Sequence, residues 1–301
     1  SVSREATNSK RIAKFDDFNK AIKLSTPYYS IDSLYDNPPL YDVYISGSDQ
    51  LWNPEQPFPI EPYFLTFVQN SNAKKISYAS SIGISSLEPL QVRDFTRWLS
   101  SYDAVSVREP EAARILQPHL KQKIEIVADP TFLLDVNEWN LLAHDYSEKG
   151  YILCFMLAFQ PVLLTEALRV SNDLGKKLIV IGQRGIPKNK RYTLIDDAGP
   201  REFLGLIKCA DCVFTDSFHG TVFSILLGVK NFFSYVAIGN RRVSRLETLL
   251  SPLGHLDRII RNDDFSKVYG LLKEGVDIEK QNSIVRMESE SSRDFLNNSV
   301  L

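Results

Sequence analysis

One histidine in this sequence stands where it could act as an acid. Residues 215–220 read TDSFHG, follow the apolar pair Val213-Phe214 and precede an apolar stretch over 222–227, which predicts a turn from a strand into a helix. Free amides at such a helix start bind phosphate or carboxylate groups. The helix dipole disfavours an imidazolium there, whereas a bound anion favours it. His219 would therefore gain a proton when an anion arrives, which suits a general acid; the alternative is a histidine that only caps or packs.

The neighbours of His219 indicate how this turn is built. Asp216 and Ser217 are residue types that cap helices, and Gly220 lets a ligand or another backbone approach the first turn. Ser217 also raises the alternative of a serine hydrolase. The G-x-S-x-G motif is absent, however, and a separation of two residues within one turn gives Ser217 and His219 poor geometry as a nucleophile and its base.

A second loop with hydrogen-bonding side chains follows a strand signal at 41–45. Residues 47–53 read GSDQLWN, where Gly47 permits a sharp turn and Asp49 and Gln50 bring groups that hydrogen-bond hydroxyls. Trp52 offers an aromatic face on which a sugar can stack. The loop is therefore a candidate binding site, although the start of a capped helix fits the same composition.

A third loop carries an arginine directly after a strand signal at 104–107. We expect Arg108 to point into a cleft, where its fork can hold a carboxylate or phosphate with two hydrogen bonds. A surface ion pair with Glu109 is the alternative. Helix starts at 200 and 240–245 offer further amides and guanidiniums, Arg245 among them. A Walker loop, an H-E-x-x-H motif and ligand-spaced Cys/His clusters are absent from the sequence, so it does not indicate a metal.

Alternating strand and helix signals predict the elements that carry these loops. Strands are expected at 41–45, 75–80, 104–107, 124–127, 151–157, 177–181, 211–215 and 231–235. Helices are expected at 15–24, 91–99, 110–116, 162–174, 200–208 and 221–227. Such alternation is typical of parallel, doubly wound sheets, whose ligands bind beyond the carboxyl ends of the strands. We expect a first domain over 1–143, a polar linker at 144–150, a second domain over 144–275, and a helix over 276–301 that packs back on the first domain.

Composition excludes several functional classes. The chain has 301 residues with 35 basic and 37 acidic side chains, a formal net charge of −2, which argues against nucleic acid as a partner and against a polybasic membrane anchor. Three cysteines do not make a disulfide framework. Cys209 and Cys212 close a helix and enter a strand, the reverse of the order in redox motifs, so we expect buried structural thiols. Neither a signal peptide nor a transmembrane segment is expected.

Six motifs in sequence order resemble those of one family. They are residues 47–53 (GSDQLWN), 77–83 (SYASSIG), 106–109 (SVRE), 129–134 (DPTFLL), 216–220 (DSFHG) and 245–250 (RLETLL). This order is similar to that in polysaccharide pyruvyl transferases, and the resemblance covers about residues 10–260. It implies a GT-B-like fold, in which two Rossmann-like domains face each other across a cleft.

The resemblance also implies a reaction. Members transfer the enolpyruvyl carbons of phosphoenolpyruvate to a sugar diol of a bacterial surface or extracellular polysaccharide, giving a pyruvate ketal and phosphate without a metal or cofactor. The general acid implied is His219, and the implied acceptor-side base is Asp49, with Gln50 and Trp52 beside it. The donor-binding residues implied are Arg108, Ser217, Phe218, Gly220 and Arg245. The acceptor, free or lipid-linked, would be met in the cytoplasm or at the inner face of the membrane.

One departure and two alternatives accompany the resemblance. Family members usually begin with a strand and a glycine-rich N-Y-G-type loop before the region matching 10–18, so we expect a first domain without its initial strand-helix unit. A nucleotide-sugar glycosyltransferase would share the GT-B architecture and the anion site, but no nucleobase-and-ribose pocket is evident in the second domain. A glycan-binding protein without catalysis would not need a histidine at an anion-binding turn.

Overall fold

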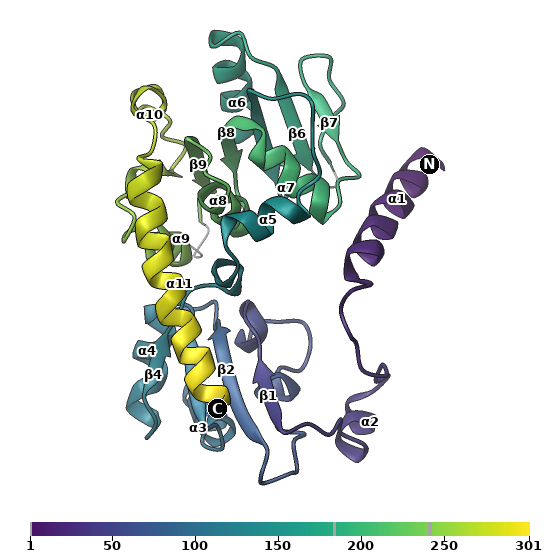
Figure 1. Cartoon of the computed structure of the whole chain (residues 1–301), viewed down its shortest axis with the longest axis vertical. Coiled ribbons are helices and arrows are strands. Elements are labelled where there is room, and N and C mark those ends of the chain that lie inside the picture. Colours follow the sequence, from purple (N-terminus) through teal and green to yellow (C-terminus); the bar gives the residue numbers. More distant parts are fainter. Residues whose placement is uncertain (1, 183–184, 240–242) are drawn as a thin grey trace. The chain divides into compact units, whose positions relative to one another are not determined.

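The chain forms two compact units, each built on a parallel sheet (Figure 1). The computed structural model describes residues 2–182, 185–239 and 243–301, with side chains from residue 8 onward. The six-stranded unit comprises Ser1–Lys23 and Leu134–Ile284, and the four-stranded unit comprises Leu24–Leu133 and Val285–Leu301. Helix α11 (Ile278–Val300) therefore begins in the first of these units and ends in the second.

The four-stranded unit has its strands in sequence order, β1-β2-β3-β4, all parallel. Its elements are α2 (Ile31–Asp36), β1 (Val43–Ser46), β2 (Lys74–Ser80), α3 (Pro89–Leu99), β3 (Ala104–Val107), α4 (Pro110–Leu116) and β4 (Ile124–Ile126), with single 3-10 turns at Gln50–Trp52, Glu61–Phe64, Gln117–His119 and Pro130–Leu133. Parallel neighbours in sequence order require crossover helices of one hand, so α3 and α4 lie on the same face of the sheet.

Two clusters of buried side chains hold this unit together. The larger joins α3 and α4 to the sheet through residues such as Phe95, Leu116 and Val105. The smaller lies where Tyr78 and Val127 meet Phe295 of α11. Hydrogen bonds fix α11 there, since Ser289 Oγ donates to the carbonyl of Phe132 at 2.6 Å. The last part of α11 thus packs on the four-stranded sheet.

The six-stranded unit has the strand order β10-β9-β8-β5-β6-β7, also parallel throughout. Its elements are α1 (Val2–Asn19), α5 (Val136–Leu142), β5 (Tyr151–Met156), α6 (Pro161–Asp173), β6 (Leu178–Gly182), β7 (Thr193–Ile195), α7 (Pro200–Lys208), β8 (Ala210–Thr215), α8 (Phe218–Leu226), β9 (Asn231–Val236), α9 (Val243–Leu250), β10 (Ile259–Arg261) and α10 (Val268–Glu274), with a 3-10 turn at Leu256–Arg258. The strand order reverses at β5 and β8, the kind of position where doubly wound sheets bind ligands.

Burial on both faces explains the apolar strands of this unit. Every residue of β6 is buried, and in β5 all but Phe155 are buried, as expected when helices cover a parallel sheet on both sides. Helix α6 packs against β5, β6 and β8, while α7 and α8 contact β8 and each other. Proline stands in the first turn of α6 and α7. An amide hydrogen at this position has no hydrogen-bond partner within the helix, so proline, which lacks one, costs nothing there.

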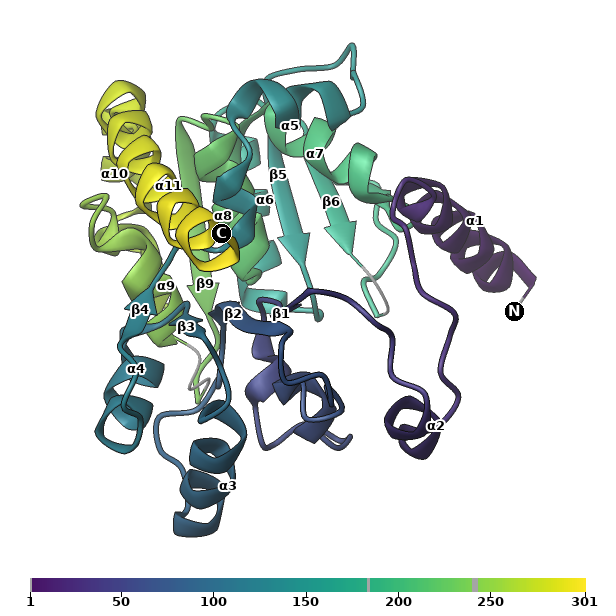
Figure 2. The same cartoon turned by 60° about the horizontal axis from the view of Figure 1, so that its bottom comes forward.

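Helix α1 is attached to the six-stranded unit beside α7 (Figures 1 and 2). Lys14 Nζ lies 3.1 Å from Glu202 Oε1 and donates to the carbonyl of Asp197 at 2.9 Å. The guanidinium of Arg201 lies 5.9 Å from the ring centroid of Phe18. Residues 1–23 therefore belong to the six-stranded unit. The sequence predicted that they belong to a first domain over 1–143, together with the four-stranded sheet.

The predicted alternation of strands and helices is confirmed, with three differences. The first helix spans 2–19 instead of 15–24. The expected linker at 144–150 packs inside the six-stranded unit, where His144 N–H donates to the carbonyl of Arg201 at 2.9 Å. Strands β7 and β10 and helices α2, α5 and α10 were not predicted, whereas α9 is the helix whose start was expected within 240–245. The predicted buried thiols are confirmed, since Cys209 and Cys212 are both buried and neither forms a disulfide.

Candidate functional site

Arg108 gathers the loops at the carboxyl ends of the four-stranded sheet. It follows β3 directly, and its Nη1 donates to Oδ2 of Asp129, beyond β4, at 2.6 Å. Its Nε donates to Oε1 of Glu109 at 3.1 Å, and its Nη2 lies 3.4 Å from Oδ1 of Asp49, beyond β1. Ser81, beyond β2, donates to the same Glu109 oxygen at 2.9 Å. The loops after all four strands therefore meet in one cluster, as the shared edge of a parallel sheet predicts.

Burial decides what Arg108 can do in this cluster. Arg108 is 5% exposed, Glu109 5% and Asp129 4%. Burial alone would lower the pKa of Arg108, but the negative charges of Glu109 and Asp129 outweigh it and raise the pKa above its usual value. The Arg108–Glu109 pair forms, although it is buried and not on the surface. Because the guanidinium holds the protein's own carboxylates, its binding of a donor substrate stays a prediction.

Asp49 is the exposed member of the same cluster. Its side chain is 62% exposed, and its backbone adopts φ 69° and ψ −171°, a region that residues other than glycine seldom occupy and that often marks functional loops. Neighbouring backbone holds it there, since Ser81 N–H donates to the Asp49 carbonyl at 3.0 Å and Asp49 bridges Ser80. The loop thus presents a carboxylate outward while Arg108 contacts it from inside.

Gln50 is packed into the loop that Asp49 begins. Its Oε1 accepts a hydrogen bond from Asn53 Nδ2 at 3.2 Å, while its Nε2 is buried and makes no hydrogen bond to a described residue. Gly83, at φ +71°, leaves room for it, because a Cβ there would lie 2.7 Å from Gln50 Cδ. The glycine that ends the 77–83 motif therefore serves the packing of Gln50.

Trp52 is a core residue, which corrects its interpretation as a platform for a sugar. Its side chain is fully buried and stacks on Phe64, with the ring centroids 4.7 Å apart. Its Nε1 donates to the carbonyl of Tyr63 at 3.2 Å. No ring face is left for a ligand because Phe64 and the surrounding aromatic cluster cover it.

The turn at 215–220 lies in the six-stranded unit and starts α8. Ser217 is the N-cap, and its Oγ accepts a hydrogen bond from Gly220 N–H at 3.2 Å. Asp216 does not cap the helix; its Oδ1 accepts from Leu157 N–H at 2.7 Å and so ties the loop after β5 to the loop after β8. Gly220 permits close packing on Thr215, since a Cβ would lie 2.4 Å from Thr215 Oγ1.

His219 stands in the first turn of α8 and lines a pocket of about 400 Å³. Residues at or just beyond the ends of β5, β6, β7 and β8 form much of the wall, so the pocket sits at the carboxyl end of the six-stranded sheet. Ser217 and Gly199, the N-caps of α8 and α7, both line it. Two helix N-termini, the positive ends of the helix dipoles, therefore border the space next to the imidazole.

Arg11 and Phe15 of α1 complete this pocket, and the sequence interpretation missed both. Arg11 is the only lysine or arginine among the described lining residues. Its guanidinium lies 5.6 Å from the ring centroid of Phe15, and it forms no ion pair with a described carboxylate. Their separation of four residues, which puts two side chains on one helix face, was the available signal. The chain thus brings a cation to the pocket from a segment with no recognised motif.

Arg245 lies near the same turn. Its guanidinium is 5.5 Å from the ring centroid of Phe218, and the Phe218 ring lies edge-on to His219, with centroids 5.4 Å apart. The Phe218 ring thus lies near both Arg245 and His219. The other arginines expected at this helix start, within 240–242, lie outside the described residues.

The predicted site residues fall into two groups. The four-stranded unit brings Asp49 and Gln50 together with Arg108, and the six-stranded unit brings Ser217, Phe218, His219, Gly220 and Arg245 together. That both groups face one cleft stays a prediction. Within the described residues no three His, Cys, Asp or Glu side chains are grouped to hold a metal ion. No described helix combines the length and apolar composition needed to cross a bilayer.

A family model matches most of the chain. The model described as polysaccharide pyruvyl transferase aligns with residues 4–235, a range that includes the loops around Asp49, Arg108 and His219. Among curated proteins none matches the chain.

Solved structures with a similar fold are GT-B-like enzymes. UDP-GlcNAc 2-epimerase from Neisseria meningitidis, bound to UDP-GlcNAc, is 10% identical with a TM-score of 0.54 and covers 99% of this chain and 98% of that chain. UDP-N-acetylglucosamine 2-epimerase from Rickettsia bellii is 11% identical with a TM-score of 0.52, covering 98% and 94%. The glycotransferase of kitacinnamycin is 12% identical with a TM-score of 0.52, covering 99% and 81%. These likenesses confirm the fold class of two Rossmann-like, GT-B-like units.

Proposed function

Because the chain belongs to the polysaccharide pyruvyl transferase family, we propose that it transfers a carboxyethylidene group from phosphoenolpyruvate to two hydroxyls of a saccharide. The observation that carries this proposal is His219 in the wall of a pocket bordered by two helix N-termini. Helix N-termini favour anions, and phosphoenolpyruvate carries a phosphate and a carboxylate. The pocket size, about 400 Å³, falls in the range of small-molecule sites.

The proposed reaction needs one acid and one base. Protonation turns the methylene carbon of phosphoenolpyruvate into a methyl group and leaves C2 electron-poor, so that a sugar hydroxyl attacks C2 and gives its proton to the base. A second hydroxyl then attacks C2 while the bond from C2 to the phosphate oxygen breaks. One hydroxyl proton replaces the proton given to carbon, and the other leaves with phosphate. Positioned acids and bases lower the barriers of such proton transfers.

His219 is the group that we propose as the acid. It stands beside the helix N-termini that would hold the donor's anionic groups, so its ring would lie next to a bound donor. The donor's charge would be met by Arg11, which lines the same pocket, and Arg245 would add a cation beyond Phe218. Ser217 and Gly220 contribute through the turn itself, since they fix the start of α8.

Asp49 is the group that we propose as the acceptor-side base. Its carboxylate is exposed, and the contact from Arg108 Nη2 at 3.4 Å would orient it. Arg108 then has a positioning role through Asp49 as well as the proposed donor-binding role, and these roles predict different defects. Loss of orientation lowers turnover, whereas loss of a donor contact weakens binding of phosphoenolpyruvate.

A nucleotide-sugar glycosyltransferase is the alternative with the same architecture. Thermal unfolding with phosphoenolpyruvate, and separately with UDP- and GDP-sugars, distinguishes the two because a specific ligand raises the melting temperature. We expect phosphoenolpyruvate to raise it in a concentration-dependent manner and the nucleotide sugars to leave it unchanged. A shift with a nucleotide sugar and none with phosphoenolpyruvate would reject the proposed donor.

A further inference from the structure

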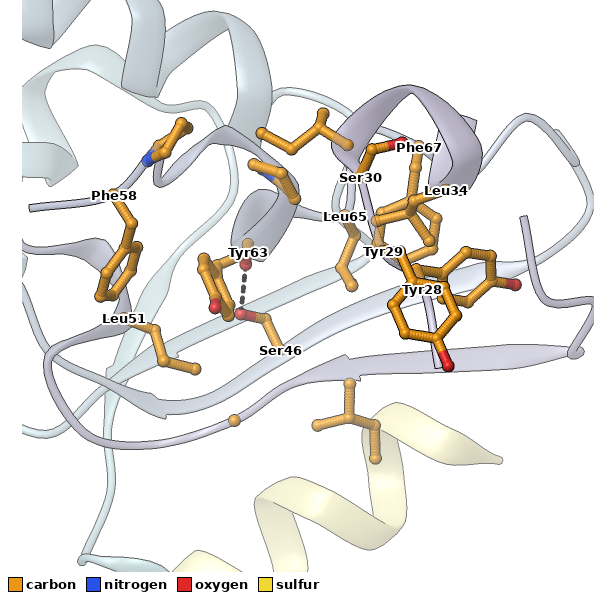
Figure 3. Close-up of a pocket in the computed structure, with 15 residues that line it drawn as sticks. Tyr28, Tyr29, Ser30, Leu34, Ser46, Leu51, Phe58, Tyr63, Leu65 and Phe67 are labelled. Atoms are coloured by element: carbon orange, nitrogen blue, oxygen red, sulfur yellow. Dashed lines mark hydrogen bonds between the residues drawn. The ribbon is translucent and has the colours of Figure 1, made fainter. Parts of the chain in front are cut away.

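The four-stranded unit carries a second pocket, of about 540 Å³, that no motif identifies. Figure 3 shows two groups of side chains around it. Tyr28, Tyr29 and Phe67 lie on one side, and Leu51, Phe58 and Tyr63 lie on the other. Apolar and aromatic residues thus line most of a space that is large enough for a small molecule.

The side chains of this pocket are unusually exposed for their type. Tyr29 is 93% exposed, and Tyr28, Phe58 and Tyr63 are each between 37% and 41% exposed. Ile45 of β1, which also lines the pocket, is 45% exposed. Exposed apolar groups that gather in one place mark a binding surface more often than exposed groups scattered singly.

One ring hydrogen bond, two bonds to a backbone carbonyl and one ring contact fix part of this surface. The hydroxyl of Tyr28 donates to the carbonyl of Asn37 at 2.9 Å. The carbonyl of Tyr63 accepts from Ser46 Oγ at 2.6 Å, which Figure 3 marks, and from Trp52 Nε1 at 3.2 Å. Tyr63 also contacts Phe58, with ring centroids 5.6 Å apart. A prearranged aromatic surface binds its ligand with a smaller loss of side-chain entropy.

The chemistry of the lining favours a sugar. Tyrosine offers an apolar face together with a hydroxyl at its edge, and a sugar ring offers a face of C–H groups surrounded by hydroxyls. Tyr29 and Tyr63 hydroxyls make no hydrogen bond to a described residue, so they can bind the hydroxyls of a ring that stacks beside them. A hydrocarbon chain would use the apolar faces and leave these hydroxyls unused.

The position of the pocket relates it to the proposed acceptor-side base. Gly47 and Leu51 line it, and they lie on either side of Asp49 in the same loop. We propose that this pocket binds the acceptor saccharide next to Asp49, with Tyr29, Phe58 and Tyr63 as the surface that selects it. This inference rests on the proposed function, because membership of the family makes a saccharide the acceptor.

Saturation-transfer NMR on the full chain tests the pocket directly. The probes are methyl β-glycosides of glucose, galactose, N-acetylglucosamine and N-acetylmannosamine, together with cellobiose and lactose. We expect transfer to at least one probe, strongest on the C–H groups of one ring face. Phe58→Ala and Tyr29→Ala should each weaken the affinity for that probe at least fivefold. Tyr41→Ala, an exposed tyrosine of the same unit that does not line the pocket, should leave it unchanged.

The possible outcomes separate this inference from the proposed function. Phosphoenolpyruvate is titrated into the same variants, and its binding should not depend on Tyr29 or Phe58. If phosphoenolpyruvate binds but no probe receives saturation, or if Tyr29→Ala and Phe58→Ala bind the probe as the wild type does, the pocket is not the acceptor site and the proposed function stands. Analytical ultracentrifugation would also overturn the inference if the wild type is a dimer and Tyr29→Ala is a monomer, since a second copy would then cover the pocket. If phosphoenolpyruvate does not bind, the proposed function fails independently of the sugar result.

Discussion

The loops after β3 and β8 each place a polar residue at the carboxyl end of a parallel sheet, but the two residues are used differently. Arg108 is 5% exposed and contacts carboxylates from three loops. His219 lines a pocket, in a turn that Ser217 and Thr215 hold in place. A position just beyond a strand therefore indicates that a residue belongs to a site. Burial then decides whether its side chain can contact a ligand or can only position other side chains that contact it.

The largest expected effect concerns the stability that Arg108 supplies. Arg108→Ala leaves the buried carboxylates of Glu109 and Asp129 without their guanidinium, which should lower the free energy of unfolding by about 3–5 kcal/mol. Urea-induced unfolding measures this change. Arg114→Ala removes an arginine whose side chain is 67% exposed in its pair with Glu111, and should lower it by less than about 1 kcal/mol. Equal losses in the two variants would show that the Arg108 cluster is not a structural centre.

His219→Ala should lower turnover and leave stability almost unchanged, the opposite of what is expected for Arg108→Ala. Loss of a general acid lowers turnover by about 10²–10⁴-fold, while the free energy of unfolding and the affinity for phosphoenolpyruvate should change little. Release of phosphate from phosphoenolpyruvate, in the presence of a saccharide that binds, measures turnover. His144→Ala is the matched control, because His144 is an exposed histidine of the same unit outside the pocket. Near-normal turnover of His219→Ala would reject the general-acid assignment.

The smallest expected effect is a pH dependence at Asp216. Burial raises the pKa of its carboxyl above the usual 3.8, although hydrogen bonds from the loop after β5 oppose the rise. The folded protein thus holds this proton more tightly than the unfolded chain, so the contribution to stability is full below pH 3.8 and is lost as the pH rises through the raised pKa.

Asp216→Asn cannot ionise and should not show this loss. Chemical unfolding of the wild type and of Asp216→Asn between pH 3 and pH 7 measures the difference in stability. We expect the difference to move in favour of the variant as the pH rises. A difference that stays constant over this range, or moves toward the wild type, would contradict a raised pKa.

Much of the fold could be predicted because its signals are local. A strand such as β5 is an apolar run of six residues, and helices such as α7 begin with a proline. The missed strands β7 and β10 have three residues each, too few to show a period. Helix α1 was placed too late, since the opening residues are mostly polar and its attachment depends on the contact of Lys14 with Glu202 of α7.

The site could be predicted only where its contacts join residues that are close in sequence. The turn at His219 was predicted because its N-cap, Ser217, and Gly220 are close to it in sequence. The burial of Arg108 among carboxylates was not predicted, since two of them, Asp49 and Asp129, are 59 and 21 residues away. Trp52 was misassigned for the same reason, because Phe64, which covers its ring, belongs to another turn.

Calorimetric titration of phosphoenolpyruvate tests most directly whether the His219 pocket is the donor site. The wild type should bind phosphoenolpyruvate, and Arg11→Gln should bind it at least tenfold more weakly, as expected for loss of a charge-assisted hydrogen bond of about 1.5 kcal/mol or more. Lys10→Gln makes the same charge change on the same helix, at an exposed residue outside the pocket, and should bind as the wild type does. No binding by the wild type, or equal affinity of the Arg11→Gln and Lys10→Gln variants, would contradict the assignment.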